Sequence, residues 1–229
     1  MVTRVQPATR LYKAHRPIAT TCITFVDDDG KAEVWEKIKA AAEEKGIPFV
    51  LSLVNDWQEL TQNQCLYMQN VLGFEIASHS YTHANLNLAT PEELEVELLG
   101  SKNNFISRGY NVENIVYPWG EANASVQTEV AKYYNCGAAT LVGINTRPVS
   151  TYYLKRVALG AFADPNTLDF YKAKIDEAIS NSGWLIFMLH VSYVTHDATQ
   201  QDYLLQTIEY AKEQGVRIVT LQQGYEAFL

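Results

Sequence analysis

The sequence predicts an α/β fold in which parallel strands alternate with helices. Apolar runs of strand length recur between amphipathic stretches of helix length over the whole chain. Glycine, proline and capping residues stand at several of the junctions between them. Alternation at this density over 229 residues favours a (β/α) barrel or a doubly wound sheet.

The first part of the chain predicts three strands. Residues 18–26 form an apolar, β-branched run, and residues 32–45 form an amphipathic helix that ends at Gly46. Residues 47–54 predict a buried second strand, and residues 73–78 predict a third. The order of strand, helix and strand is typical of a parallel βα unit.

A strong helix start follows at Thr90. Thr90 is a good N-cap, Pro91 suits the first helical position, and Glu93 completes a capping box, so we expect a helix that runs to about Arg108. Later elements are predicted from the same patterns: strands at residues 114–117, 137–142, 153–159 and 184–189, then a helix at 203–214, Gly215 and a last strand at 216–221. The total is seven or eight strands.

Composition limits the class of protein. With 229 residues, 47% hydrophobic content and a net charge of −8, we expect one globular domain over residues 1–229, with 1–17 as an N-terminal extension. The acidic balance and the lack of basic clusters argue against nucleic acid or an anionic membrane as a partner. Cys22, Cys65 and Cys136 form no paired motif, so we expect three core thiols.

No apolar segment approaches the length of a membrane span, and the first residues lack the hydrophobic core of a secretion signal. We therefore expect a soluble chain. An excised domain, or a chain whose signal has been removed, would look the same. The place where the protein works and its oligomeric state stay open at this stage.

Two histidines four residues apart point to a metal site. His79 and His83 follow the third predicted strand, and one helical turn between them would direct both rings the same way. Catalytic zinc takes three protein ligands. The third would come from the triplet Asp27, Asp28 and Asp29, because three adjacent carboxylates at a strand end repel one another unless a cation sits among them.

The polar motifs all follow predicted strands. The aspartate triplet follows the first strand, residues 118–120 follow the fourth, and His190 follows the run 184–189. Barrels and doubly wound sheets both place their chemistry beyond the carboxyl ends of the strands. These motifs are therefore expected to converge on one cleft, in which His15 and His196 take no part.

Taken together, the motifs at residues 24–30, 79–83, 117–120 and 189–190 resemble those of the polysaccharide deacetylase family, the NodB-homology carbohydrate esterases. The resemblance covers nearly the whole chain in the right order. It implies a distorted (β/α) barrel with about seven parallel strands. It also implies one divalent metal, with zinc expected, and hydrolysis of acetyl groups from a glycan.

The resemblance also implies a role for each matching residue. Asp29, His79 and His83 would hold the metal, Asp28 would be the general base, and His190 would protonate the leaving group. The backbone N–H of Trp119 would join the metal in the oxyanion hole. Tyr117 and Leu189 would contact the substrate. The family's two aspartates could also align one residue earlier in the triplet, and this shifted frame, with Asp27 as ligand or base, stays open.

Two departures from the family pattern concern supporting residues. Val116 stands where the third motif usually has an arginine that buttresses the base, and Arg156 is nominated as its substitute. The Asp-x-x-Asp-Trp motif that often orients the catalytic histidine is missing, and Asp164 is nominated for that role.

The expected partner is an acetylated polysaccharide or oligosaccharide, with N-acetylglucosamine polymers or peptidoglycan favoured over O-acetylated glycans. Four aromatic residues, Trp57, Tyr81, Trp119 and Tyr193, would either form a sugar-stacking platform or pack in the ordinary way. Two alternative functions remain: a metal-dependent amidohydrolase acting on a small amide, and a glycan-binding module without turnover. The family's substrates imply an extracellular or cell-surface location, while an excised domain, a phage virion or a cytoplasmic origin stays open.

Overall fold

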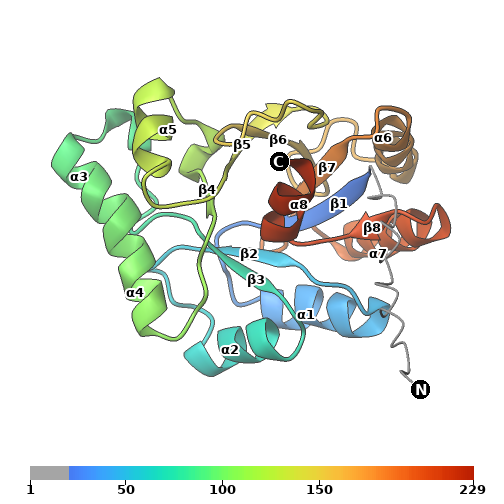
Figure 1. The fold of residues 1–229 in the computed structure, drawn as a ribbon. Helices are drawn as coiled ribbons and strands as arrows, with labels where there is room; N and C mark the ends of the chain where they lie inside the picture. Colours follow the sequence, from blue (N-terminus) through green and yellow to red (C-terminus); the bar gives the residue numbers. More distant parts are fainter. Residues whose placement is uncertain (1–20) are drawn as a thin grey trace, which may run out of the picture.

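The computed structural model describes residues 21–229; the expected N-terminal extension and His15 lie outside this range. Seven parallel strands form a closed barrel, because β1 pairs with β7 on one side and with β2 on the other (Figure 1). The strands are β1 (Cys22–Asp27), β2 (Val50–Leu53), β3 (Glu75–Ser78), β4 (Ile115–Val116), β5 (Gly137–Val142), β6 (Leu154–Ala158) and β7 (Trp184–Leu189). The predicted barrel is confirmed.

An eighth strand, β8 (Arg217–Ile218), distorts this barrel. It pairs with the beginning of β1, where Cys22 lies opposite Arg217. The second strand of the barrel pairs only with the end of β1, where Val26 lies opposite Val50. The first strand therefore changes neighbours along its length, and the barrel is regular only towards the carboxyl end of β1.

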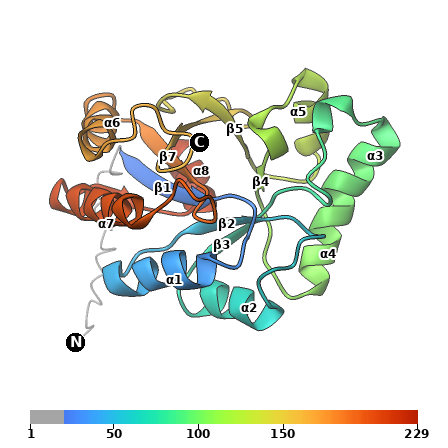
Figure 2. The ribbon, with the colours of Figure 1, turned by 180° about the vertical axis from the view of Figure 1, so that it is seen from behind.

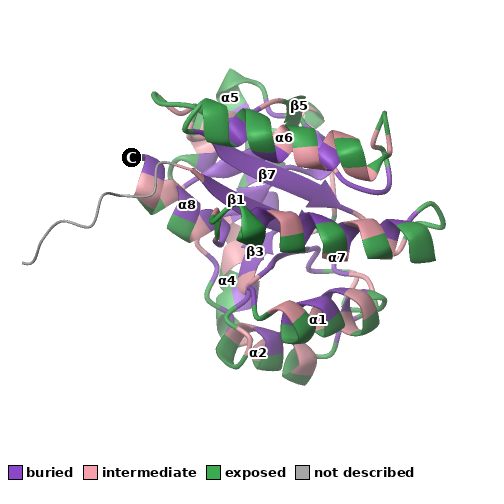
Figure 3. Cartoon of the chain, turned by 90° about the vertical axis from the view of Figure 1, so that its right-hand side faces the viewer, coloured by how far each residue is buried: buried purple, intermediate pink, exposed green. Residues whose placement is uncertain are grey.

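Helices surround the barrel (Figure 1). They are α1 (Val34–Lys45), α2 (Gln62–Asn70), α3 (Pro91–Glu95), α4 (Ser101–Ser107), α5 (Ala124–Val130), α6 (Leu168–Ser180) and α7 (Ala198–Glu213), with short 3₁₀ turns η1 (Leu86–Leu88) and η3 (Pro118–Gly120). Most strand residues are buried, although the second half of β5 is exposed, and the helices bury only their inward faces (Figure 3). A final helix, α8 (Leu221–Phe228), lies in front of the barrel in Figure 1 and behind it in Figure 2.

Several predicted boundaries are confirmed by the caps. Gly46 ends α1 in the left-handed conformation, and Thr90 forms the predicted capping box with Glu93. The helix predicted from Thr90 contains a π-helical turn, η2 (Val96–Gly100), between α3 and α4. The prediction of a strand up to residue 221 is wrong at its end, because Thr220 caps α8 instead.

The apolar side chains form two layers. One lies inside the barrel and includes Cys22, Val26 and Trp184, and the other lies between the strands and the helices and includes Ile23 and Phe25. The three cysteines are free and buried, as expected. Successive residues of β1 therefore alternate between the inside and the outside of the barrel.

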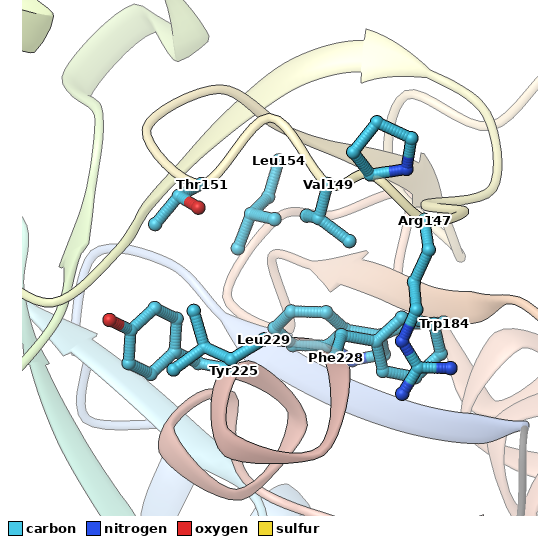
Figure 4. Close-up of a pocket in the computed structure, with 9 residues that line it drawn as sticks. Arg147, Val149, Thr151, Leu154, Trp184, Tyr225, Phe228 and Leu229 are labelled. Carbon is cyan, nitrogen blue, oxygen red and sulfur yellow. The ribbon is translucent and has the colours of Figure 1, made fainter.

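A cavity of about 520 Å³ lies where α8 covers the barrel (Figure 4). It is bordered by Leu154 and Trp184, the first residues of β6 and β7. The guanidinium of Arg147 lies 4.7 Å from the centre of the Phe228 ring, and the other lining side chains are uncharged. This cavity is at the amino ends of the strands, so the predicted catalytic residues are at the opposite end.

No helix within residues 21–229 has the length and apolar content that a membrane crossing requires.

Candidate active site

Strand alternation separates the three aspartates of the triplet. Asp27 follows Val26, an inside residue, and therefore points out of the barrel, where it accepts a hydrogen bond from the backbone N–H of Val191 at 3.0 Å. Burial raises the pKa of Asp27 well above its usual value. Asp28 points inward. The shifted frame, with Asp27 as ligand or base, does not fit this structure.

A tight turn directs Asp29 towards the histidines. Asp29 and Gly30 both have left-handed backbones, with φ of 80° and 64°. A Cβ on Gly30 would lie 2.4 Å from Cδ2 of Leu53, and the left-handed backbone also disfavours a side chain, so glycine suits this position. The glycine that ends the triplet thus permits the turn that places the Asp29 carboxylate.

Asp29, His79 and His83 form the predicted cluster. Oδ1 of Asp29 lies 3.5 Å from Nε2 of His79 and 3.7 Å from Nε2 of His83. Ligands bonded to a tetrahedral zinc ion lie about 3.4 Å apart, as bond lengths near 2.1 Å require. Within residues 21–229 this is the cluster of three whose donor atoms could hold one metal ion.

The protonation states of the three donors suit a metal. Nδ1 of His79 lies 2.8 Å from the carbonyl oxygen of Val116, which can only accept, so Nδ1 carries the proton and Nε2 offers its lone pair. Burial, aided by the neighbouring His79, lowers the pKa of His83 to about 4. Burial opposes ionisation of Asp29, but the facing His79 brings the net pKa of Asp29 below its usual value. Two imidazoles and one carboxylate fit a divalent metal.

The segment between the two histidines is a loop, so the prediction of one helical turn is wrong. Ser80 and His83 have positive φ angles of 65° and 67°, which no right-handed helix allows. The hydroxyl of Ser80 accepts the N–H of His83 at 3.0 Å. Both rings still face Asp29, because the loop turns sharply at these two residues.

Glu97 supports this loop through hydrogen bonds, and no motif in the sequence predicted this role. Its carboxylate accepts the backbone N–H groups of Tyr81 and Thr82 at 2.9 and 3.0 Å, and the Thr82 hydroxyl donates to it at 2.6 Å. Glu97 lies on the π-helical turn and is only 6% exposed. Its position on the same helix face as Leu94 and Leu98, which are buried, could have predicted such a role, because an acid on an apolar helix face needs a specific partner.

Arg156 holds the inward carboxylate of Asp28. Its Nη1 lies 2.9 Å from both Asp28 oxygens, and its Nε donates to the carbonyl oxygen of Ala139 at 2.7 Å. The hydroxyl of Ser52 donates to Asp28 Oδ1 at 3.3 Å. The side chain of Arg156 is almost fully buried. The structure therefore brings the nominated arginine, from β6, to the aspartate at the end of β1.

His190 faces Asp28 from the end of β7, with 3.8 Å between its Nε2 and Asp28 Oδ2. Its ring is held by the edges of Phe162 and Tyr193, with centroid distances of 5.0 and 5.2 Å. Nδ1 of His190 is buried and has no hydrogen-bond partner among residues 21–229. The nominated Asp164 is exposed and does not reach it, so the predicted orienting role of Asp164 does not hold in this structure. Burial lowers the pKa of His190.

Aromatic side chains surround the cluster. Trp119 has a left-handed backbone with φ of 62°, is 65% exposed, and donates from Nε1 to the carbonyl oxygen of His83 at 3.2 Å. The rings of Trp57 and Trp119 lie 4.9 and 5.2 Å from the ring of His83. Tyr193 lines the other side, beside His190. Tyr81 instead lies near Gly100, so three of the four predicted platform residues border the site.

Two predicted substrate contacts are not at the site. Tyr117 and Leu189 have no exposed surface, and the Tyr117 hydroxyl donates to the carbonyl oxygen of Tyr152 at 2.8 Å. Leu189 packs in the layer between strands and helices, because alternation turns its neighbour Met188 into the barrel mouth. His196 is bonded to Gln201 away from the cluster, as expected.

These features define a class: a parallel barrel that carries two histidines, one aspartate and a flanking aspartate and histidine beyond its strand ends. The family profile described as "Polysaccharide deacetylase" matches residues 14–136, which is more than half of the chain. The chain belongs to the polysaccharide deacetylase family, a family of hydrolases.

Solved structures share the fold at low sequence identity. A T48 deacetylase with substrate has a TM-score of 0.68 and 16% identity, covering 91% of this chain and 93% of that one. The Xyl-CE4 domain of a multidomain xylanase from the hindgut metagenome of Trinervitermes trinervoides has a TM-score of 0.67 and 19% identity, covering 90% of this chain and 89% of that one. A family 4 carbohydrate esterase from Streptomyces lividans in complex with acetate has a TM-score of 0.66 and 16% identity, covering 89% of this chain and 95% of that one. No curated protein sequence matches the chain.

Proposed function

We propose that this protein is a zinc-dependent deacetylase that removes acetyl groups from a glycan containing N-acetylglucosamine. The observation that carries the proposal is the pairing of a three-donor cluster with an inward aspartate, Asp28, which Arg156 holds opposite His190. Family membership supports the same reaction. Such polymers lie outside the cytoplasm, so we also propose an extracellular or cell-surface location.

Asp29, His79 and His83 would hold the metal. A bound metal would supply Lewis-acid polarisation of the acetyl carbonyl and would make a water molecule easier to deprotonate. Asp28 would take the proton from that water, and the contact of Arg156 Nη1 with both of its oxygens keeps its carboxylate fixed in the orientation required.

The remaining steps fall to His190 and Trp119. His190 lies on the far side of Asp28 and would donate a proton to the departing nitrogen. The backbone N–H of Trp119 would donate to the developing oxyanion. Trp57 and Tyr193, on opposite sides of the cluster, would stack on sugar units that extend along the cleft.

Acetate release from N-acetylglucosamine monomer through pentamer tests the proposal. We expect turnover to rise with chain length, since remote sugar units contribute binding energy that orients the acetyl group. A His79→Ala/His83→Ala variant is the control and should be inactive. No turnover of any oligomer, with hydrolysis of a small cyclic amide instead, would favour the amidohydrolase alternative. Oligomer binding without turnover would favour a glycan-binding module.

A further inference from the structure

A cavity of about 360 Å³ opens beside the catalytic aspartate, at the carboxyl ends of β5, β6 and β7. Arg156, which holds Asp28, forms part of its wall. Trp119 and Phe162 stand on its two sides, 65% and 63% exposed. The cavity is therefore continuous with the site and is bordered by residues that contact His83 and His190.

The lining of this cavity is unsuited to a sugar ring. Val142, Ala158 and Met188 contribute apolar surface together with the two aromatic side chains. The two polar lining residues, Thr140 and Arg156, are bonded to protein carbonyl oxygens, and Arg156 also to Asp28. None of the described lining residues carries a carboxylate or a carboxamide. Most hydroxyls of a sugar ring placed here would face the five apolar side chains and would lose their hydrogen bonds with water.

The cavity is also larger than an acetyl group requires. Its volume of 360 Å³ is roughly that of a dozen water molecules at about 30 Å³ each, whereas the methyl group of an acetyl occupies about one such volume. An acetyl group would leave most of this apolar space filled by poorly bonded water.

Only the acyl side of the substrate can enter. The leaving group must meet His190 and then continue as a chain towards solvent. The cavity instead extends to Met188 and Arg156, which are 8% and 2% exposed in the barrel mouth. These two buried residues block the passage of a polymer at the inner end of the cavity, whereas a terminal acyl group can reach them.

We propose that this enzyme removes N-acyl groups longer than acetyl, from propionyl to hexanoyl, and that this cavity selects them. The inference rests on the proposed function and changes its acyl specificity. The oxygen of water bonds to the acyl carbon and the C–N bond breaks. One water proton passes to the leaving nitrogen and the other is released to solvent, so the products are a carboxylate and an amine.

A series of N-acetyl, N-propionyl, N-butyryl and N-hexanoyl chitotrioses tests the inference, with the released amine measured in every case. The leaving group is constant, so differences report the acyl side alone. We expect kcat/KM to rise along the series, by at most about fourfold per methylene, which is the limit for complete burial of one CH₂.

Ala158→Leu fills the cavity and should reverse the preference, lowering the ratio of butyryl to acetyl kcat/KM below that of the unmodified enzyme. Ala173→Leu on the exposed face of α6 is the matched control and should leave the ratio unchanged. If Ala158→Leu does not fold, Val142→Phe at the rim, where Val142 is 67% exposed, should narrow the same entrance.

The outcomes separate the inference from the function. Hydrolysis of the acetyl compound, with kcat/KM falling at each added methylene, would overturn the inference and keep the deacetylase. An unchanged acyl ratio in both cavity variants would also overturn it. Failure to hydrolyse any member of the series, including the acetyl compound, would instead contradict the proposed deacetylase function.

Discussion

The two sides of the catalytic cleft are held in place by different interactions. On the metal side, hydrogen bonds fix the groups: Val116 orients His79, and Glu97 takes three hydrogen bonds from the loop before His83. On the acid side, His190 is held by the edges of two aromatic rings, and its Nδ1 lacks a hydrogen-bond partner among the described residues.

This difference matches the tasks proposed for the two sides. Metal ligands must keep their distances within a few tenths of an ångström, which directional hydrogen bonds provide. A general acid must only reach the leaving atom, and contacts with aromatic rings place the imidazole less directionally than hydrogen bonds do. The charge-assisted contact of Arg156 Nη1 with both Asp28 oxygens places Asp28 with the rigid side.

The largest effect is expected from removing the metal side itself. His79→Ala/His83→Ala should abolish stoichiometric metal binding and lower turnover by roughly a thousandfold or more, because Lewis-acid stabilisation contributes several kcal/mol. Elemental analysis of the purified protein measures the first effect and acetate release the second. His196→Gln, outside the cluster, is the control. Stoichiometric metal in the double variant would exclude this site.

Asp28→Asn should separate the base from the ligand. We expect turnover to fall by about 10²- to 10⁴-fold, the usual contribution of a general base, while metal content is unchanged. Asp27→Asn is the matched control at the adjacent position. Its amide oxygen can still accept the Val191 N–H, so activity should be nearly normal. The reverse pattern would show that the two aspartates exchange roles.

His190→Ala should affect substrates according to their leaving groups. An amide nitrogen must be protonated to depart, so the rate on an N-acetylated sugar should fall by about 10²- to 10⁴-fold. An aryl acetate releases a stable phenolate and should lose less than about tenfold. The ratio of the two losses is the measurement, and equal losses would mean that His190 has a structural role.

Glu97→Gln tests whether the loop contacts matter to the metal side. The amide would present N–H groups to backbone donors, so we expect metal affinity to weaken by about 10- to 100-fold, as for other residues that support ligands. Chelator competition gives the affinity, and thermal unfolding of the metal-free protein checks the fold. Exposed Glu95→Gln on the same helix is the control. Equal affinities in both variants would make Glu97 dispensable for metal binding.

The sequence could predict features that depend on neighbouring residues, and it could not predict those that depend on contacts across the fold. Strands β5 and β7 lie at the predicted residues, and the Thr90 capping box is present, because period, propensity and capping are local properties. The metal residues also stand in short motifs. A four-residue spacing, however, occurs in loops as well as helices, so the helical turn after His79 was wrongly predicted.

Supporting residues were harder to predict because they act across the fold. Arg156 reaches Asp28 over 128 positions of sequence, and a resemblance to a known family nominated it without giving its geometry. Glu97 and Phe162 belong to no motif, since each is defined by what it contacts. Tyr117 and Leu189 were placed at the substrate because the family resemblance includes them in its motifs, but strand alternation turns them into the core.

The smallest effect concerns His196, a buried histidine outside both sides of the cleft. Its Nε2 is paired with Gln201 and its Nδ1 has no partner within residues 21–229. Burial lowers its pKa from 6.5, so the folded state favours the neutral ring. This preference stabilises the fold above pH 6.5 and is lost as the pH falls below that value. The unfolding free energy of metal-free protein should therefore decline from pH 7.5 to 5.5 more steeply in the unmodified chain than in His196→Gln. Parallel declines would show that His196 titrates alike in the folded and unfolded states, and that the pH response arises in the cleft.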